Sequence, residues 1–162
     1  MAFLETICGK LIMTMAIAAV PVVELRGAIP AGAAAGLDPW LACAAAMLGN
    51  LLPVPFIVLL VRRAFDWLRK RPRLAPKIDW LERRAHLKGR AHLKGRLVRK
   101  YRLVGLTLFV AVPLPGTGAW TGALIAALLD IRLRHALPAI AVGVFIAGII
   151  VTLMTLGVIH LI

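Results

Sequence analysis

Four long apolar stretches divide the chain, and only two of them are free of a strong break. They cover residues 6–36, 39–61, 103–129 and 136–162. A straight helix needs about 20 apolar residues to cross a hydrocarbon core of about 30 Å. Residues 39–61 and 136–162 meet this requirement, so we expect each to form one transmembrane helix.

Each of the other two stretches contains a cluster of prolines and glycines near its middle. The clusters are PVVELRGAIPAG at 21–32 and PLPGTGAWTG at 113–122. Because proline removes a backbone donor and glycine relaxes the chain, we expect neither cluster to form a regular helix. Non-helical backbone persists at membrane depth only where protein buries it or where it lines a wet cavity. We therefore predict that 6–36 and 103–129 are re-entrant elements, which enter and leave the membrane on one side.

Positive charge is concentrated in one segment, residues 62–102, which holds 16 of the 20 Lys and Arg and only three acids. The chain is 61% hydrophobic and 17% charged, yet its formal net charge is +13, all of which arises in this segment. Soluble domains typically have about 25% charged residues, so this composition excludes a soluble enzyme with a mixed surface and indicates an integral membrane protein. Since cytoplasmic loops are enriched in Lys and Arg, we predict a cytoplasmic basic loop. It joins membrane repeats 1–61 and 103–162 of a multi-pass protein of the inner (plasma) membrane.

Two arginines bear on the orientation of the second broken stretch. Arg132 and Arg134 lie in the short link between residues 129 and 136. If 103–129 crossed the membrane, this link would lie outside, against the charge rule. A re-entrant 103–129 returns the link to the cytoplasmic side, which is the interpretation we favour over a spanning segment.

The two broken stretches share a sequence pattern. Val-Pro, Gly-Ala and a later aspartate recur in this order at 20–38 and 112–130, although chance similarity in Ala/Gly-rich sequence is an alternative. A hairpin followed by one span reverses the starting side, so two copies form an inverted repeat. Transporters built in this way bind substrate near the midplane. We predict an all-α integral membrane protein, an inverted repeat of a re-entrant helix hairpin plus a transmembrane helix.

Glu24 and Arg26 are the most informative polar residues, because both lie inside an apolar stretch. An isolated charge there costs at least about 2.5–3.5 kcal/mol. Residues two apart do not face each other on a helix. In an unwound segment, Arg26 could bind a substrate anion while Glu24 exchanges a proton. The alternative is a structural charge pair that holds the two repeats together.

The second cluster supplies backbone N–H groups, the Thr117 hydroxyl and a helix start near Ala119. Helix N-termini attract anions, so this cluster and Arg26 predict a pocket for a phosphate or carboxylate group. The alternative is a tight turn with a capping threonine. Trp120 is interpreted as either a substrate wall or a packing residue. Asn50 needs a hydrogen-bond partner, across a helix interface or in the pocket.

The remaining polar residues show no catalytic pattern. Neither the four histidines nor the two cysteines have the spacing of a metal site, so we expect no metal, no cofactor and no enzyme. The basic loop repeats RAHLKG at 84–89 and 90–95, which we interpret as a tolerated duplication. This loop mainly sets orientation. A helix on anionic lipid is an alternative role, and nucleic-acid binding is the less favoured one.

Three runs carry a family resemblance: PVVELRGAIPAGAAAGL at 21–37, GNLLPVP at 49–55 and AVPLPGTGAWTGALIAALL at 111–129. They resemble the family of putative small multidrug export proteins. That family is similar in architecture to the DedA/VTT superfamily, whose members carry paired re-entrant helices and are linked to lipid or lipid-carrier translocation. With Asn50, the candidate substrate-binding residues are Glu24, Arg26, Gly27, Pro30, Pro113, Pro115, Gly116, Thr117, Gly118, Trp120 and Gly122.

The predicted function is a small membrane transporter, an exporter or flippase of an amphipathic or anionic lipid-like substrate. Glu24 would be the proton-coupling or gating acid and Arg26 the anion-binding group. The partners would be membrane lipids and a lipid-like or drug-like substrate. We expect a homo-oligomer, because two spans and two hairpins are too small a bundle to enclose a bulky path alone. Small-residue faces such as 42–46 and 143–148 permit close helix approach. The alternative is a non-transporting membrane interaction protein whose basic loop binds anionic lipid or a partner.

Overall fold

The computed structural model describes residues 6–69, 95–114 and 117–161, and the regular elements in these ranges are all α-helices. They are α2 (Ile7–Ala19), α3 (Glu24–Ala34), α4 (Pro39–Leu51), α5 (Val54–Arg69), α7 (Gly95–Ala111), α8 (Ala119–Leu128) and α9 (Leu133–Leu161). The all-α fold class is thereby confirmed for the described residues. Most of the basic loop, including its duplicated hexapeptide up to residue 94, lies outside them, as do Pro115 and Gly116.

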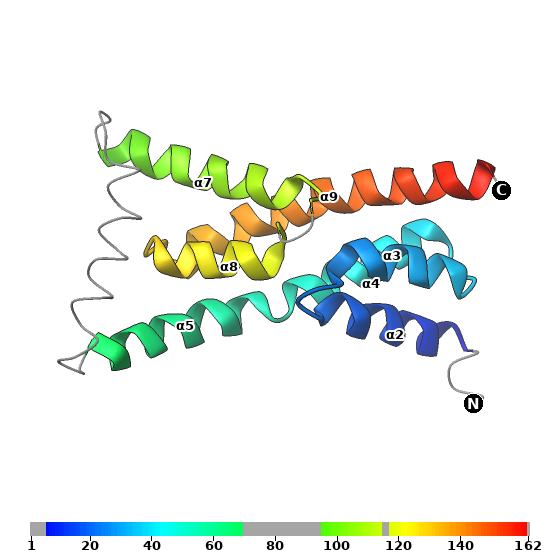
Figure 1. Cartoon of the computed structure of the whole chain (residues 1–162), viewed down its shortest axis with the longest axis horizontal. Coiled ribbons are helices and arrows are strands. Elements are labelled where there is room, and N and C mark those ends of the chain that lie inside the picture. Colours follow the sequence, from blue (N-terminus) through cyan, green and yellow to red (C-terminus); the bar gives the residue numbers. More distant parts are fainter. Residues whose placement is uncertain (1–5, 70–94, 115–116, 162) are drawn as a thin grey trace.

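The helices lie along one long axis (Figure 1). α9 runs most of the length of the molecule, and α4 and α5 follow each other end to end along the same axis. The α2–α3 hairpin occupies the half that contains both chain ends, and the α7–α8 hairpin occupies the opposite half. The turns of the two hairpins therefore meet near the middle of the molecule.

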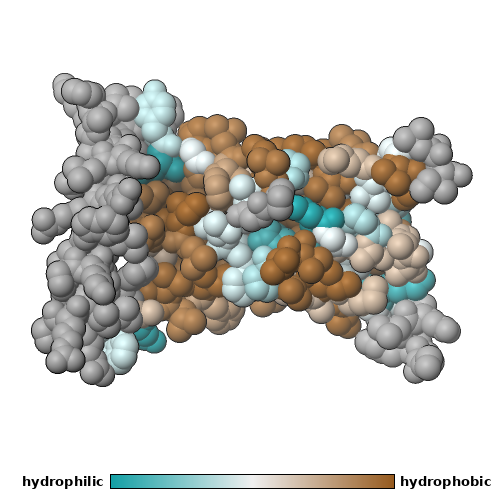
Figure 2. Space-filling model, viewed as in Figure 1, coloured by the Kyte–Doolittle hydropathy of each residue, from teal (hydrophilic) through white to brown (hydrophobic). Residues whose placement is uncertain are grey.

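Two apolar helical stretches are long enough to cross a membrane: Pro39–Ala64, which includes the turn between α4 and α5, and Leu133–Ile159. They correspond to the spans predicted at 39–61 and 136–162. Large apolar side chains are well exposed along them, with Phe56 and Leu60 each 69% exposed. Figure 2 shows apolar surface over both halves of the face in view, with polar residues gathered near its middle. Soluble monomers rarely expose apolar surface so extensively, whereas a lipid-facing surface requires it.

The first Pro/Gly cluster is more helical than the sequence predicted. Only residues 20–23 are non-helical, and α3 continues through Pro30. Proline interrupts a helix by removing one donor, which costs about 3 kcal/mol. Here α3 packs against α2, α4 and α9 and buries Leu25, Ala28 and Ile29. This packing stabilises the helix against its poor propensity, so the prediction of an irregular 21–32 segment was wrong.

The other breaks follow the prolines. α7 ends two residues before Pro113, and α8 does not begin until Ala119. Pro53 and Pro55 separate α4 from α5, because neither can donate to the carbonyl four residues earlier. Helices extend further into the predicted 62–102 loop than we expected, since α5 continues to Arg69 and α7 begins at Gly95.

α3 and α8 end in the same type of cap. Gly36 and Asp130 have left-handed backbones, with φ of 86° and 52°. The amides of Leu37 and Ile131 each donate to a carbonyl five residues earlier, at 3.0 and 2.9 Å. This is the Schellman pattern, including a buried apolar residue after the left-handed one. The two halves thus end their hairpins with the same type of cap, in which Gly36 corresponds to Asp130. The sequence comparison had paired Asp38 with Asp130, whereas Asp38 instead caps α4.

The small-residue faces considered for oligomerisation pack inside the chain. A Cβ on Gly143 would lie 2.7 Å from Val110 Cβ, and Gly148 lies against Met47 in the same way. Residues 42, 43, 45 and 46 are buried as well. These faces bring α4, α7 and α9 together, so they are not available for the dimer contact that we expected them to form.

Candidate functional site

Glu24 links the first hairpin to the second at their turns. It begins α3, is 5% exposed, and its Oε1 accepts a hydrogen bond from the Trp120 amide at 3.3 Å. That amide belongs to the first turn of α8, whose N–H groups have no partner within the helix. The φ of Glu24 is 49°, in a left-handed region that costs a non-glycine residue about 1–2 kcal/mol. The Glu24 carboxylate therefore caps α8 from another helix.

Gly118 provides the space for this cap. It is the N-cap residue of α8, and its own position supplies no side-chain hydrogen bond. A Cβ built on Gly118 would overlap the Glu24 carboxylate. Its φ of −159° is extended and suits any residue, so glycine is required here for space and not for its backbone freedom.

Arg26 contacts the turn between α7 and α8 at different residues from those that Glu24 contacts. Its Nη2 donates to Thr117 Oγ1 at 2.9 Å and to the Val112 carbonyl at 3.3 Å. Arg26 forms no direct ion pair with a carboxylate of the described residues, whereas Arg62 pairs with Asp130 at 2.8 Å. Glu24 and Arg26 thus bind different parts of the second hairpin and do not pair with each other.

Thr117 and Trp120 complete the contact between the hairpins. The Thr117 hydroxyl accepts from the Leu114 amide at 3.2 Å, and its hydrogen is directed to the carbonyl of Val112 or Leu114. Trp120 Nε1 donates to the Ala19 carbonyl at the end of α2, at 3.2 Å. Thr117 therefore closes its own turn, while Trp120 packs as a bridge between the hairpins.

This geometry changes the predicted anion pocket. The N-terminus of α8 is not open to a ligand, because Glu24 already occupies it. Arg26 lies on a helix and not in an unwound segment. The alternative, a structural charge pair that holds the two repeats together, agrees with the structure in one respect. Both charged residues join the hairpins, but each does so through its own hydrogen bonds and not as an ion pair.

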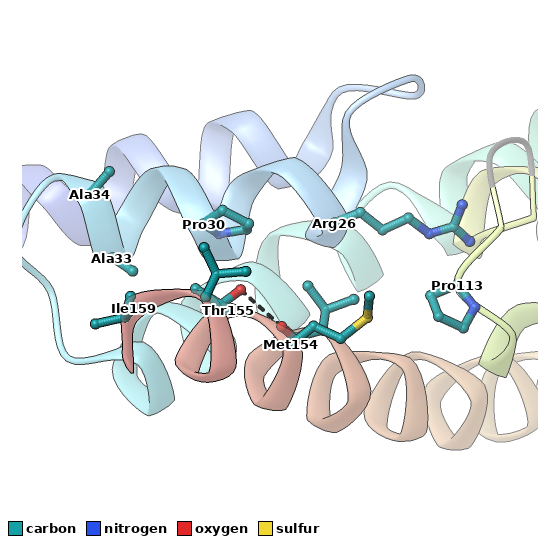
Figure 3. Close-up of a pocket in the computed structure, with 10 residues that line it drawn as sticks. Arg26, Pro30, Ala33, Ala34, Pro113, Met154, Thr155 and Ile159 are labelled. Carbon is teal, nitrogen blue, oxygen red and sulfur yellow. Dashed lines mark hydrogen bonds between the residues drawn. The ribbon is translucent and has the colours of Figure 1, made fainter. Parts of the chain in front are cut away.

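A cavity of about 590 Å³ opens beside Arg26, between α3 and α9. We call it the α3–α9 groove. Figure 3 shows Arg26 and Pro113 at one end and Ala34 and Ile159 at the other, with Pro30 and Met154 between them. Its volume lies in the range of small-molecule sites. Apart from Arg26 and Thr155, whose hydroxyl donates to the Val151 carbonyl, its lining is apolar.

Residues 24–150 match a family model described as "Putative small multi-drug export protein". The chain belongs to this family. The matched segment contains Glu24, Arg26 and the turn between α7 and α8, so the family match covers the contact between the hairpins. Together with the two apolar stretches, it indicates a membrane protein of the transport class. No curated protein and no solved structure matches the chain.

The structure separates the predicted family-motif residues into groups. Pro30 and Pro113 line the α3–α9 groove with Arg26, whereas Gly122 packs against Val110 inside the protein. Gly27 lies on α3, where an added Cβ would overlap the Val23 side chain. Pro115 and Gly116 lie outside the described residues.

Asn50 does not join this site. It is fully buried in the last turn of α4, and within the described part of the chain neither of its amide atoms has a partner. It does not line the α3–α9 groove. The predicted partner for Asn50, in the pocket or across a helix interface, is therefore not found among those residues.

Sequence reasoning missed the contribution of α9. Met154, Val158 and Ile159 line the groove, but residues 136–162 carry no charged residue and are mostly apolar, so no pattern distinguishes a groove face from a lipid face. The described residues contain no cluster of three or more His, Cys, Asp and Glu that could bind a metal ion.

Proposed function

We propose that this chain is a small transporter of the plasma membrane that exports or flips an amphipathic or anionic lipid-like substrate at the junction of its two hairpins. The observation that carries the proposal is the set of hydrogen bonds that join buried Glu24 and half-buried Arg26 to the second hairpin within an apolar protein, with Glu24 as acceptor and Arg26 as donor. Ionisable groups at such depth are costly and usually mark a transport pathway. The family description supports the same class of function.

The proposal includes re-entrant hairpins arranged as an inverted repeat. α2 and α3 have 13 and 11 residues, so they extend about 20 and 17 Å, less than the membrane core. The Arg62–Asp130 pair brings the start of the basic segment beside the link that follows α8. Both positively charged segments then lie on one side, in agreement with the charge rule. This arrangement also fits the resemblance to the DedA/VTT superfamily.

Transport would require the hairpins to separate or slide at their turns. The left-handed Glu24 is a position where strain accompanies a functional contact. Protonation of its carboxylate would weaken the cap on α8, and this is how we propose that proton coupling operates. A homo-oligomer remains part of the proposal, with an interface other than the small-residue faces that pack within the chain.

Reconstituted transport tests this proposal. Proteoliposomes would be assayed with NBD-labelled phosphatidylglycerol for flipping and with ethidium for export, each with and without a proton gradient. We expect Glu24→Gln and Arg26→Ala to slow transport of the active probe at least about tenfold, since each removes a charge-assisted hydrogen bond. Arg134→Ala, an exposed arginine away from the hairpin turns, is the matched control and should leave the rate unchanged.

Wild-type rates in both site variants, at equal protein incorporation, would contradict the proposed site. The interaction-protein alternative would instead be favoured by two results together. The parent protein would transport neither probe, and deleting residues 78–94 would abolish its binding to anionic lipid or to a partner. This deletion leaves the described helices α5 and α7 intact.

A further inference from the structure

We infer that the α3–α9 groove binds a single-chain amphipathic anion, with its charged group at Arg26 and its apolar body directed toward Ile159. The inference rests on the proposed function, because it names the substrate class and its orientation at that site. It adds a binding surface on α9, which no motif of the family resemblance includes.

The charge of Arg26 is the first observation. Glu24 directs its carboxylate to α8 and acts on Arg26 only from a distance, so the guanidinium has no direct ion pair in the described part of the chain. Both of its hydrogen bonds come from Nη2. A guanidinium carries five N–H donors, so Nη1 and Nε still have donors for a carboxylate or phosphate. An apolar cavity whose one guanidinium keeps free N–H donors and no direct ion pair is complementary to an anion with an apolar body.

The order of residues along the groove gives the orientation. Arg26 and Pro113 lie near the hairpin turns, whereas Ile159 lies near the C-terminal end of α9 (Figures 1 and 3). A lipid in its ordinary leaflet position would place its headgroup at the membrane surface, beside Ile159, and its tails beside Arg26. That pose puts apolar tails against the charge, so the groove fits a molecule in the opposite orientation. Its volume of about 590 Å³ suits one drug-sized ligand.

Binding is tested on the full chain in phosphatidylcholine nanodiscs with dansylaminoundecanoic acid as the probe. The comparison probes are its methyl ester, which lacks the charge, and a trimethylammonium compound of equal chain length. Val158→Trp fills the groove from an exposed position, and Val142→Trp, equally on α9 but outside the groove, is the matched control. Arg26→Gln removes the charge.

We expect the acid to bind the wild-type protein at least about tenfold more tightly than the ester, and Arg26→Gln to abolish this difference. Val158→Trp should weaken binding of the acid at least about tenfold, whereas Val142→Trp should not. If Arg26→Gln does not fold, the ester comparison and the tryptophan pair still decide the matter. Equal affinity for acid and ester, equal effects of the two tryptophans, or tighter binding of the cation would overturn the inference.

Phosphatidylglycerol in the nanodisc distinguishes a resident two-chain lipid from a single-chain ligand. Displacement of the acid by this lipid would overturn the single-chain assignment, and undisturbed binding would support it. The assay does not require transport. A protein that binds the acid as described but moves neither transport probe would contradict the proposed function alone. A protein that transports while its groove variants bind normally would contradict the groove inference alone.

Discussion

Replacing Gly118 with alanine is expected to destabilise the protein by separating its two hairpins. The added Cβ would overlap the Glu24 carboxylate, which sits against the first turn of α8. Glu24 cannot retreat freely, because it is 5% exposed and its backbone is already left-handed. The carboxylate must therefore leave the Trp120 amide, or the first turn of α8 must move.

The magnitude follows from the two groups that lose their partners. Loss of a helix cap costs about 1 kcal/mol, within a range of about 0.5–2. A buried polar group left without a donor costs about 1–3 kcal/mol, and more when it is charged. Together these terms predict a loss of about 2–4 kcal/mol in the free energy of unfolding.

The assay is reversible unfolding in detergent, followed by circular dichroism, for a double-mutant cycle with Glu24→Ala. Gly105→Ala is the control, because a Cβ at Gly105 meets nothing within 4 Å and alanine favours the helix. We expect Gly118→Ala to cost much less when Glu24 is already alanine, since the clash partner is then absent. An equal cost in both backgrounds, or a cost no larger than that of Gly105→Ala, would refute the cap.

Three further predictions concern positions away from the hairpin turns. Gly49→Ala should lower the free energy of unfolding by about 3 kcal/mol, because its Cβ would overlap the backbone of Met15. Gly157→Ala, whose Cβ meets nothing within 4 Å, should be neutral or stabilising, and chemical unfolding compares the two variants. Asp38→Ala should lower stability by about 1 kcal/mol, because two amides of α4 lose their acceptor, and Asp38→Asn should keep most of it. Arg62→Gln should cost less than about 1 kcal/mol, since its aspartate partner is 83% exposed, and a larger effect that persists in high salt would contradict this.

The positions of the breaks could be predicted from the sequence because prolines impose them locally. Pro113 ends α7 and Pro53 separates α4 from α5, as expected of residues without an N–H group. The helicity of α3 could not be predicted in this way, since packing against three neighbouring helices outweighs the effect of Pro30. Local rules therefore placed the turns but overestimated the length of the irregular segments.

The residues of the candidate site could be predicted from the sequence, but their arrangement and their hydrogen-bond partners could not. The depth of Glu24 and Arg26 in an apolar stretch marked them as informative, and their spacing argued against a mutual pair. Which partner each would choose depends on a contact 91 or 96 residues away in the chain, which no local pattern encodes. The capping of α8 by Glu24 follows from the tertiary fold and from the lack of a side chain at Gly118.

The most direct test of the account is the side of the membrane on which the ends of each hairpin lie. Single cysteines at 38, 101 and 132, in a background without Cys8 and Cys43, and the native Cys8 in a background without Cys43 would be labelled in intact cells with a membrane-impermeant maleimide, before and after permeabilisation. If both hairpins are re-entrant, we expect external labelling at 8 and 38 and labelling only after permeabilisation at 101 and 132. Labelling of 101 and 132 from opposite sides would show that the second hairpin spans the membrane, which would contradict the proposed transport site between two re-entrant hairpins.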